Sequence, residues 1–225
     1  MWTLESEVVG ELCAQRPLAI DVLRRHGIDA ADTTRSLAAC CRDLAIDVAT
    51  VLAELAHRED QLTGCWHDRA LPELIDHILR VYHRPFAATF TEAADAIDAA
   101  RPPSSEPAHA AWAELARQLA ELRADLEQHM DKEERVLFPW LRSRAETAAA
   151  PVRAMQLEHT DTVAQLHALR ASLRRCIPSG PLGPLEEAVA RKLELIERRL
   201  CEHIHLEANE LFRRALDLGL EPPRR

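Results

Sequence analysis

Apolar residues at helical spacing run through this chain, and two His-Glu pairs continue the series where further apolar residues would be expected. The first series is Leu115, Leu119, Leu122, Leu126, Val136 and Trp140. The two positions that complete it between 126 and 136 hold His129 and Glu133. Residues three or four apart share one face of a helix. The pattern therefore predicts a helix that presents an imidazole and a carboxylate to the protein core.

The same pattern of a His and a Glu four residues apart occurs near the end of the chain, where His203 and Glu207 continue a second apolar series. That series is Leu185, Val189, Leu193, Ile196, Leu200 and Leu211. Two more series each contain one histidine: His159 lies among Val152, Met155, Val163, Leu166, Leu169 and Leu173, and His83 among Ile75, Leu79, Phe86 and Phe90. We therefore expect six polar ligand-type residues inside one core.

Burial of these residues without partners would be costly, since a buried unpaired carboxylate destabilises a fold by several kcal/mol. A single inward histidine is more often a hydrogen-bonded core residue. Six histidines and glutamates that converge from four helices favour a bound metal instead. The alternative is a plain four-helix scaffold in which these residues coincide by chance.

The distribution of helix breakers predicts the domain organisation. Pro-rich breaks at 101–107, 147–151 and 178–184 separate four expected helices at 71–100, 108–146, 151–176 and 184–217. Short connections between them predict an up-down-up-down four-helix bundle over 71–218. Good helix formers dominate and aromatic residues make up 4%, with no strand-like alternation, so we expect an all-α protein.

Residues 1–60 are expected to form a small helical N-terminal domain, joined by a linker at 61–70, and residues 219–225 a flexible tail. Gly27 is expected to end one short helix, Thr33-Thr34 to cap the next and Asp47 the one after. Such short helices are marginal alone, so this domain should dock on the bundle or form a homodimer.

Charge and hydropathy exclude several classes of protein. A net charge of −9 without a basic face argues against nucleic-acid binding. No run of about 18 apolar residues occurs, so no membrane span is expected. Acidic residues in the first twenty positions argue against a signal peptide, which predicts a cytoplasmic protein. The 6 cysteines lack CxxC spacing and are expected to be reduced thiols.

The donor set predicts the kind of metal. Carboxylates and imidazoles without thiolates suit iron or manganese better than zinc, and six ligands can hold two ions bridged by carboxylates. Open positions would accept water, an oxo group, O₂, peroxide or NO. His77, Asp125 and Glu158 are candidates to flank or orient the ligands. His205 is expected to be exposed and His167 to lie at the surface.

Four motifs resemble the hemerythrin-like HHE family, and within it the branch that repairs iron centres. They are DHILRVYH, HMDKEERVLFP, MQLEHTD and HIHLEANELF, in that order. The resemblance implies a non-haem di-iron centre held by His83, His129, His159 and His203, with Glu133 and Glu207 bridging. It also implies a cytosolic stress protein that repairs damaged iron–sulfur clusters by supplying iron, or one that handles NO, rather than a turnover enzyme. The alternative function is a non-enzymatic scavenger or sensor of NO or O₂.

The sequence departs from that branch in two places. The adjacent cysteines usual in its N-terminal domain are replaced here by Ala31 and Asp32. Cys40 and Cys41 lie further along, inside an expected helix, where a core role is the simpler interpretation. Pro85 follows His83 by two residues and should kink the first helix of the bundle.

Overall fold

The computed structural model describes residues 4–30, 32, 34–143, 149–177 and 181–220. Within these ranges the chain forms helices, and its one β-type feature is an isolated antiparallel bridge between Val8 and Ser36. This confirms the prediction of an all-α protein. Within the same ranges, no helix combines the length and hydropathy that a membrane crossing requires.

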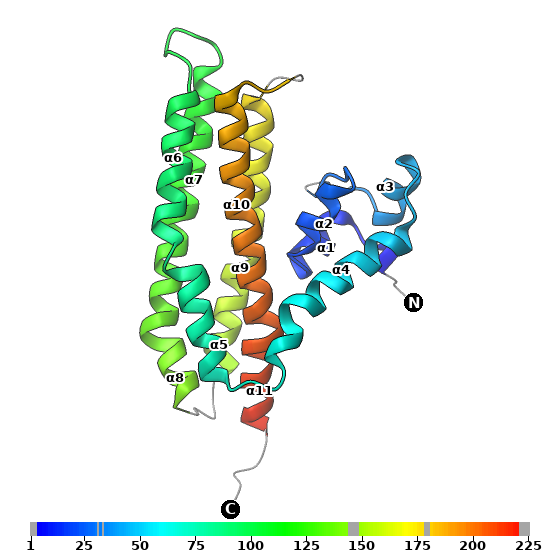
Figure 1. Cartoon of the computed structure of the whole chain (residues 1–225), viewed down its shortest axis with the longest axis vertical. Coiled ribbons are helices and arrows are strands. Elements are labelled where there is room, and N and C mark those ends of the chain that lie inside the picture. Colours follow the sequence, from blue (N-terminus) through cyan, green and yellow to red (C-terminus); the bar gives the residue numbers. More distant parts are fainter. Residues whose placement is uncertain (1–3, 31, 33, 144–148, 178–180, 221–225) are drawn as a thin grey trace, which may run out of the picture.

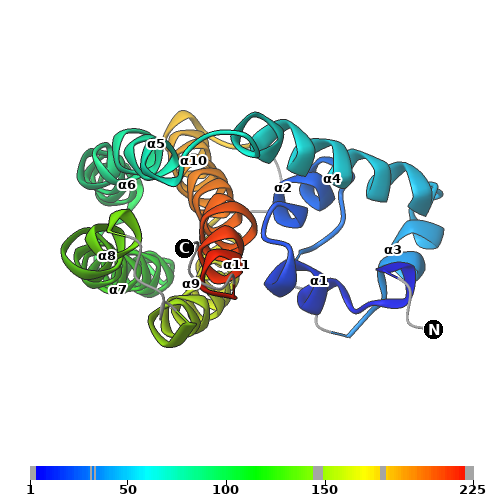
Figure 2. The same ribbon diagram turned by 90° about the horizontal axis from the view of Figure 1, so that it is seen from below.

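Four long arms form the bundle (Figure 1). The first consists of α5 (Leu71–Ile78), η3 (Leu79–His83) and α6 (Phe86–Ala100); the second of α7 (His109–Lys132), η4 (Glu133–Leu137) and α8 (Phe138–Arg142). The third is α9 (Ala149–Cys176), and the fourth consists of α10 (Pro184–Leu206), η5 (Glu207–Phe212) and α11 (Arg213–Leu220). Seen from the end, the four arms surround a common interior (Figure 2). The last helix thus continues into the expected tail, of which residues 221–225 lie outside the described ranges.

Three of the four arms contain a π-helical turn, namely η3, η4 and η5. In such a turn the backbone hydrogen bond spans five residues, as from Arg84 N–H to the Leu79 carbonyl, so one additional residue is accommodated. The first of these turns ends two residues before Pro85, at the expected break in the first helix. These turns fall where His83, Glu133 and Glu207 lie.

The π turn η4 explains one wrong prediction. Val136, expected in the core, is 60% exposed, whereas Leu137 and Leu141 are buried. Trp140, also expected in the core, is half-buried. Each residue turns a helix by about 100°, so the additional residue moves the inward face by one position. The apolar series therefore resumes at 137 and 141 instead of 136 and 140.

Four short helices form the N-terminal unit: α1 (Val9–Gln15), α2 (Ala19–Arg25), α3 (Leu37–Asp43) and α4 (Val48–Thr63), between the 3-10 turns η1 (Leu4–Ser6) and η2 (Gly64–Trp66). Gly27 has φ 73° directly after α2, and Asp47 caps α4 through its side chain, both as expected. The cap of α3 is Ser36, whose hydroxyl accepts a hydrogen bond from Ala39 N–H, and not the expected Thr34. The other expected residue, Thr33, lies outside the described residues. The α4 helix extends to Thr63, into the expected linker.

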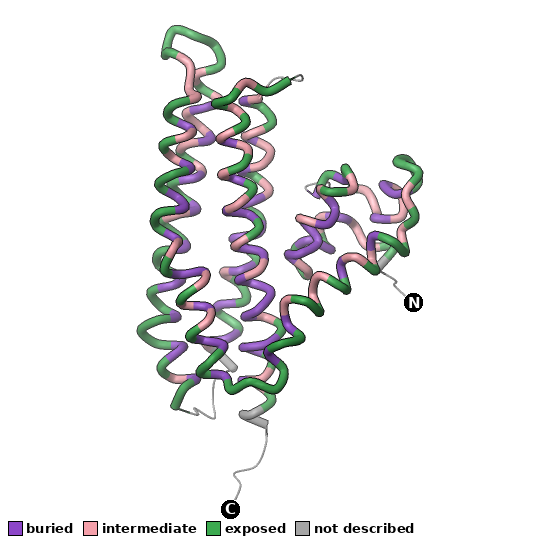
Figure 3. The backbone as a smooth tube through the Cα atoms, viewed as in Figure 1, coloured by how far each residue is buried: buried purple, intermediate pink, exposed green. Residues whose placement is uncertain are grey.

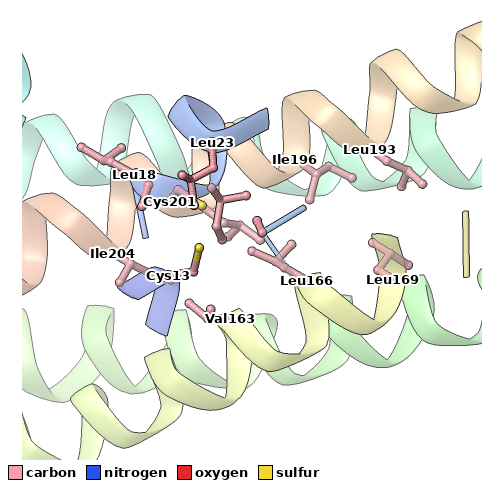
Figure 4. Packing of buried hydrophobic residues seen from close by; sticks show 14 of the residues in the cluster. Cys13, Leu18, Leu23, Val163, Leu166, Leu169, Leu193, Ile196, Cys201 and Ile204 are labelled. Atoms are coloured by element: carbon pink, nitrogen blue, oxygen red, sulfur yellow. The ribbon is translucent and has the colours of Figure 1, made fainter. Parts of the chain in front are cut away.

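The N-terminal unit packs against α9 and α10. Cys13, Leu18 and Leu23 meet Val163, Leu166, Cys201 and Ile204 in one buried cluster (Figure 4). Arg24 pairs with Glu194 at 2.6 Å, Arg58 with Glu202 at 3.5 Å, and Arg174 with Asp29 across the same boundary. Docking therefore covers the apolar face of these short helices; a homodimer through this unit stays a prediction.

Buried residues line the inner faces of the arms and the contact with the N-terminal unit (Figure 3). Leu185 is a further exception to the predicted apolar series, because it is 51% exposed, and Leu79 and Leu173 are half-buried. Leu185 lies in the first turn of α10, at the end of the bundle, where the neighbouring arms cover the helix least. The other members of that series, from Val189 to Leu211, are buried as expected.

Candidate metal centre

Six residues from all four arms meet inside the bundle, at the level of the π turns. His83 ends η3, His129 lies in the last turn of α7, and Glu133 begins η4. His159 comes from α9, His203 from the end of α10, and Glu207 begins η5. All six are buried, and both glutamates are 0% exposed. The structure thus brings together every residue that the sequence predicts as a ligand.

The six residues form two groups whose candidate ligand atoms lie within 4.8 Å of one another. The first ligand group is His83, Glu133, His203 and Glu207, and the second is His129, Glu133, His159 and Glu207. Both glutamates belong to both groups. Two ions placed in this core would therefore share two carboxylates.

Each glutamate directs one oxygen to each group. Glu133 Oε2 lies 3.5 Å from His83 Nε2, and its Oε1 lies 3.3 Å from His129 Nε2. Glu207 Oε1 lies 3.0 Å from His203 Nε2, and its Oε2 lies 3.1 Å from His159 Nε2. Each carboxylate is therefore placed to contact a cation in either group.

The two imidazoles of each group also meet through the nitrogens that would bind metal. His83 Nε2 and His203 Nε2 are 3.2 Å apart, and so are His129 Nε2 and His159 Nε2. Two ligand atoms at right angles around a cation, with bonds of about 2.1 Å, lie about 3 Å apart. The spacing of the side chains therefore fits coordination of one cation in each group.

Hydrogen bonds do not compensate the two buried carboxylates for their lost hydration. Both oxygens of Glu133 and both of Glu207 are buried and make no hydrogen bond within the described part of the chain. Their contacts with imidazole nitrogens have short distances but lack hydrogen-bond directions. Orphaned buried carboxylates are rare, because each leaves a large desolvation cost uncompensated. A cation would compensate that cost.

The electrostatics support the same interpretation. Burial and the neighbouring Glu207 raise the pKa of Glu133 to about 7. Burial also disfavours the ionised form of Glu207, but His203 and His159 outweigh it and hold its pKa well below the usual range. The pair therefore carries one negative charge readily and the second with difficulty. Positive charge between the two carboxylates would favour ionisation of both.

Two carboxylates outside the six hold ligand imidazoles. His129 Nδ1 donates to Glu158 Oε2 at 2.8 Å, as expected for this candidate, and Lys132 Nζ donates to Glu158 Oε1 at 2.7 Å. His83 Nδ1 donates to Glu134 Oε1 at 2.8 Å. Sequence analysis did not single out Glu134, although it follows Glu133 directly, because its partner lies on another arm. These bonds leave Nε2 of each histidine directed at the centre.

Aromatic rings hold the other two imidazoles. The ring of Tyr82 stacks on His203 with 5.5 Å between centroids and an angle of 9°, and Phe212 stacks on His159 at 5.8 Å and 12°. His77 touches no ligand imidazole in these contacts; its ring lies between Trp66 and Tyr82. Each ligand group therefore contains one imidazole anchored by a carboxylate and one packed on a ring.

Asp125 accepts a hydrogen bond from Gln165 Nε2 at 2.5 Å, not from an imidazole. It lines a surface cleft of about 280 Å³ between α7 and α9, together with His129, Lys132 and Glu158. Asp125 therefore lines the same cleft as His129, but its carboxylate contacts Gln165 and not the imidazole ring.

The expectation that His205 is exposed was wrong. It is 3% exposed. Burial lowers its pKa; of two residues in the N-terminal unit, Glu59 raises this pKa and Arg16 lowers it. Docking of that unit covers the outer face of α10, which the bundle pattern alone presents to solvent. His167, expected at the surface, is half-buried, and its Nε2 is enclosed.

Comparison with known proteins places these residues in a family. Residues 74–215 match the hemerythrin HHE cation binding domain, a span that contains all six candidate ligands. Three similar proteins carry the name iron-sulfur cluster repair protein YtfE. The one from Citrobacter koseri is 29% identical over 95% of this chain and 98% of its own length. Those from Enterobacter sp. and Dickeya chrysanthemi are 31% and 30% identical, each over 92% of this chain and 96% of their own.

The domain match and these relatives cover the bundle and the N-terminal unit together, and the match spans more than half of the chain. With the buried His and Glu cluster, they lead to one conclusion. The chain belongs to the hemerythrin HHE cation binding domain family.

Proposed function

We propose that this protein holds two non-haem iron ions and repairs damaged iron–sulfur clusters, acting in the cytoplasm under nitrosative and oxidative stress. The observation that carries the proposal is the sharing of Glu133 and Glu207, each with one oxygen toward each ligand group. The relatives named as iron-sulfur cluster repair proteins support the client class.

The four histidines and two glutamates would hold the ions, the glutamates as bridges. A pair of iron ions, when bound, would supply exchangeable coordination positions for NO, O₂ or peroxide and iron for a damaged cluster. Carboxylate and imidazole donors without thiolates suit iron or manganese, and iron is the choice that agrees with the relatives.

The remaining contacts prepare the ligands. Glu134 and Glu158 accept the Nδ1 protons of His83 and His129 and so fix the tautomer in which Nε2 is free to bind metal. Phe138, whose ring lies 5.6 Å from that of His83, and Phe212 are buried beside the centre. Such apolar walls limit access of water and strengthen the interaction of a cation with the carboxylates.

A second candidate function, binding of NO or O₂ without repair, is supported by the N-terminal unit. The cysteine pair usual in that unit is absent, and Cys40 and Cys41 are 4% and 1% exposed in α3. Burial raises the pKa of both thiols. They are therefore poorly placed to exchange ligands with a client protein.

Iron reconstitution followed by transfer to an inactivated [4Fe–4S] hydratase tests the proposal. Wild type should restore hydratase activity and lose iron in proportion; His129→Ala should do neither, and His57→Ala, a substitution of an exposed histidine on α4, should behave as wild type. Stoichiometric NO binding with all iron retained would favour the second candidate. Failure to restore activity with two ions verifiably bound would contradict the repair function.

A further inference from the structure

A row of rings connects the candidate metal centre with the surface of the protein. Tyr82 stacks on the ligand His203, with 5.5 Å between ring centroids. His77 meets Tyr82 edge-on at 6.0 Å, and Trp66 lies 4.6 Å from His77. The spacing is short enough for every ring to contact the next.

The outer end of this row lies where the N-terminal unit joins the bundle. Trp66 belongs to η2, directly before α5, and is 8% exposed. The residue before it, Cys65, is exposed, and the guanidinium of Arg69 lies 5.3 Å from the centroid of the indole ring. An electron that enters or leaves at Trp66 is therefore exchanged close to solvent.

The second ligand group has a phenylalanine where the first has a tyrosine. Its ring-packed imidazole, His159, stacks on Phe212, and a phenyl ring is far harder to oxidise than a phenol. Among the described residues, Phe212 makes no ring contact besides that with His159. The oxidisable ring and the row that leads outward thus occur together, on the side of His203 alone.

We propose that Tyr82 and Trp66 form a relay that carries oxidising equivalents from the metal centre to the protein surface, with His77 bridging them. The relay rests on the iron centre proposed above and adds a protective activity toward peroxide. It would prevent oxidation of the ligands when the centre meets peroxide with too few electrons of its own.

Hydrogen peroxide needs one electron more than an iron pair with a single reducing equivalent could supply. Peroxide takes up two electrons and two protons and yields two molecules of water. An iron pair, when bound, would supply one of the electrons. Tyr82 supplies the other electron together with its phenol proton, and solvent supplies the second proton. Tyr82 becomes a neutral phenoxyl radical.

Reduction of the Tyr82 radical completes the relay. Trp66 gives an electron through the ring of His77, and the phenoxyl oxygen regains a proton while the indole N–H loses one. A small thiol in solution then gives an electron and a proton to the indole radical. Two thiol radicals combine to a disulfide, so thiol is oxidised and both side chains are restored.

Electron paramagnetic resonance of the full-length, iron-loaded protein tests the relay, because Tyr82 is the only tyrosine in the chain. Protein with one electron per iron pair is mixed with one equivalent of peroxide and frozen at defined times. A radical signal that narrows when the protein contains ring-deuterated tyrosine is expected. Tyr82→Phe should abolish it and preserve bound iron, since the stacked ring remains.

A second variant tests the outward step without touching a ligand contact. Trp66→Phe should lengthen the lifetime of the tyrosine signal several-fold, whereas Trp140→Phe, which changes a half-buried indole on α8, should leave it unchanged. An equal effect of both tryptophan variants would overturn the exit through Trp66.

Iron content and iron oxidation measured in the same samples separate the two proposals. Oxidation of the iron and consumption of peroxide without a deuterium-sensitive radical would overturn the relay and leave the iron centre standing. Absence of bound iron in wild type after reconstitution would overturn both.

Discussion

The two ligand groups have the same inner residues, two histidines and the shared Glu133 and Glu207, yet their surroundings differ. In the first group Glu134, with a side chain 49% exposed, holds one imidazole, and a tyrosine covers the other. In the second group Glu158, 32% exposed and paired with Lys132, holds one imidazole, and a phenylalanine covers the other. The inner set is thus common to both ligand groups, and the outer contacts can make the two groups unequal.

Loss of a shared glutamate should affect both ligand groups equally. Glu207→Ala is expected to reduce bound iron from about two ions per chain to none, because both groups lose a bridging carboxylate. Metal analysis after reconstitution measures this. Glu187→Ala, which changes an exposed glutamate on the same arm, is the matched control and should keep both ions.

Substitution of Glu207 should also destabilise the metal-free protein. His203 and His159 hold the pKa of Glu207 well below the usual range, so the ionised carboxylate and these imidazoles stabilise the folded state together. Removal of one partner from a buried charge pair typically costs about 3–5 kcal/mol. Glu207→Leu should therefore lower the free energy of unfolding of the metal-free protein at neutral pH, as measured by chemical denaturation. An unchanged or increased free energy of unfolding would contradict this pairing.

Loss of a ligand that belongs to one group should sharpen the comparison. His83→Ala and His159→Ala should each leave about one ion per chain, in opposite groups. Metal analysis, combined with the optical or Mössbauer spectrum of the remaining iron, distinguishes the two variants. Identical spectra would mean that the tyrosine-side and phenylalanine-side sites are equivalent.

The pH dependence of the metal-free protein should reveal the strain between the shared carboxylates. Burial raises the pKa of Glu133 to about 7, so between its unfolded value of about 4.3 and 7 the folded state binds more protons than the unfolded state. Stability is then lost as pH rises through this window. Relative to Glu133→Gln, wild type should lose unfolding free energy from about pH 5 to 7.

Chemical denaturation of both proteins over that range measures the difference. Glu133 also raises the pKa of His129 and His203, so the difference between the two proteins reports Glu133 together with these two histidines. A difference that stays constant with pH would contradict the raised pKa. In iron-loaded protein the trend should reverse, because binding of the metal requires the ionised carboxylate.

The sequence was sufficient for the six ligands because each lies on an apolar series of helical spacing, and burial on one face follows from that spacing alone. The sequence did not predict which residues face the core after Glu133. The π turn there adds a residue, so Leu137 and Leu141 replace Val136 and Trp140 in the core. A period of 3.6 residues carries no signal for such an insertion.

Contacts between arms were also beyond the sequence. Glu134 and His83 are 51 residues apart, and the burial of His205 depends on a separate unit that docks on α10. Glu158 was found because it adjoins His159, although its partner proved to be His129. Adjacency along the chain identified a candidate, and only the packing of arms identified its contact.

The smallest expected effects concern the outer carboxylates, and they test whether the two groups are unequal. Substitution of such a partner typically lowers metal affinity 10–100-fold. Glu158→Ala should fall toward the upper end, because Glu158 is the less exposed of the two and is itself held by Lys132; Glu134→Ala should fall toward the lower end. Lys132→Ala removes a surface ion pair of about 0–1 kcal/mol and should weaken binding less than either. Competition with a chelator gives the affinities, and equal losses for the two glutamate variants would show that the outer contacts do not distinguish the sites.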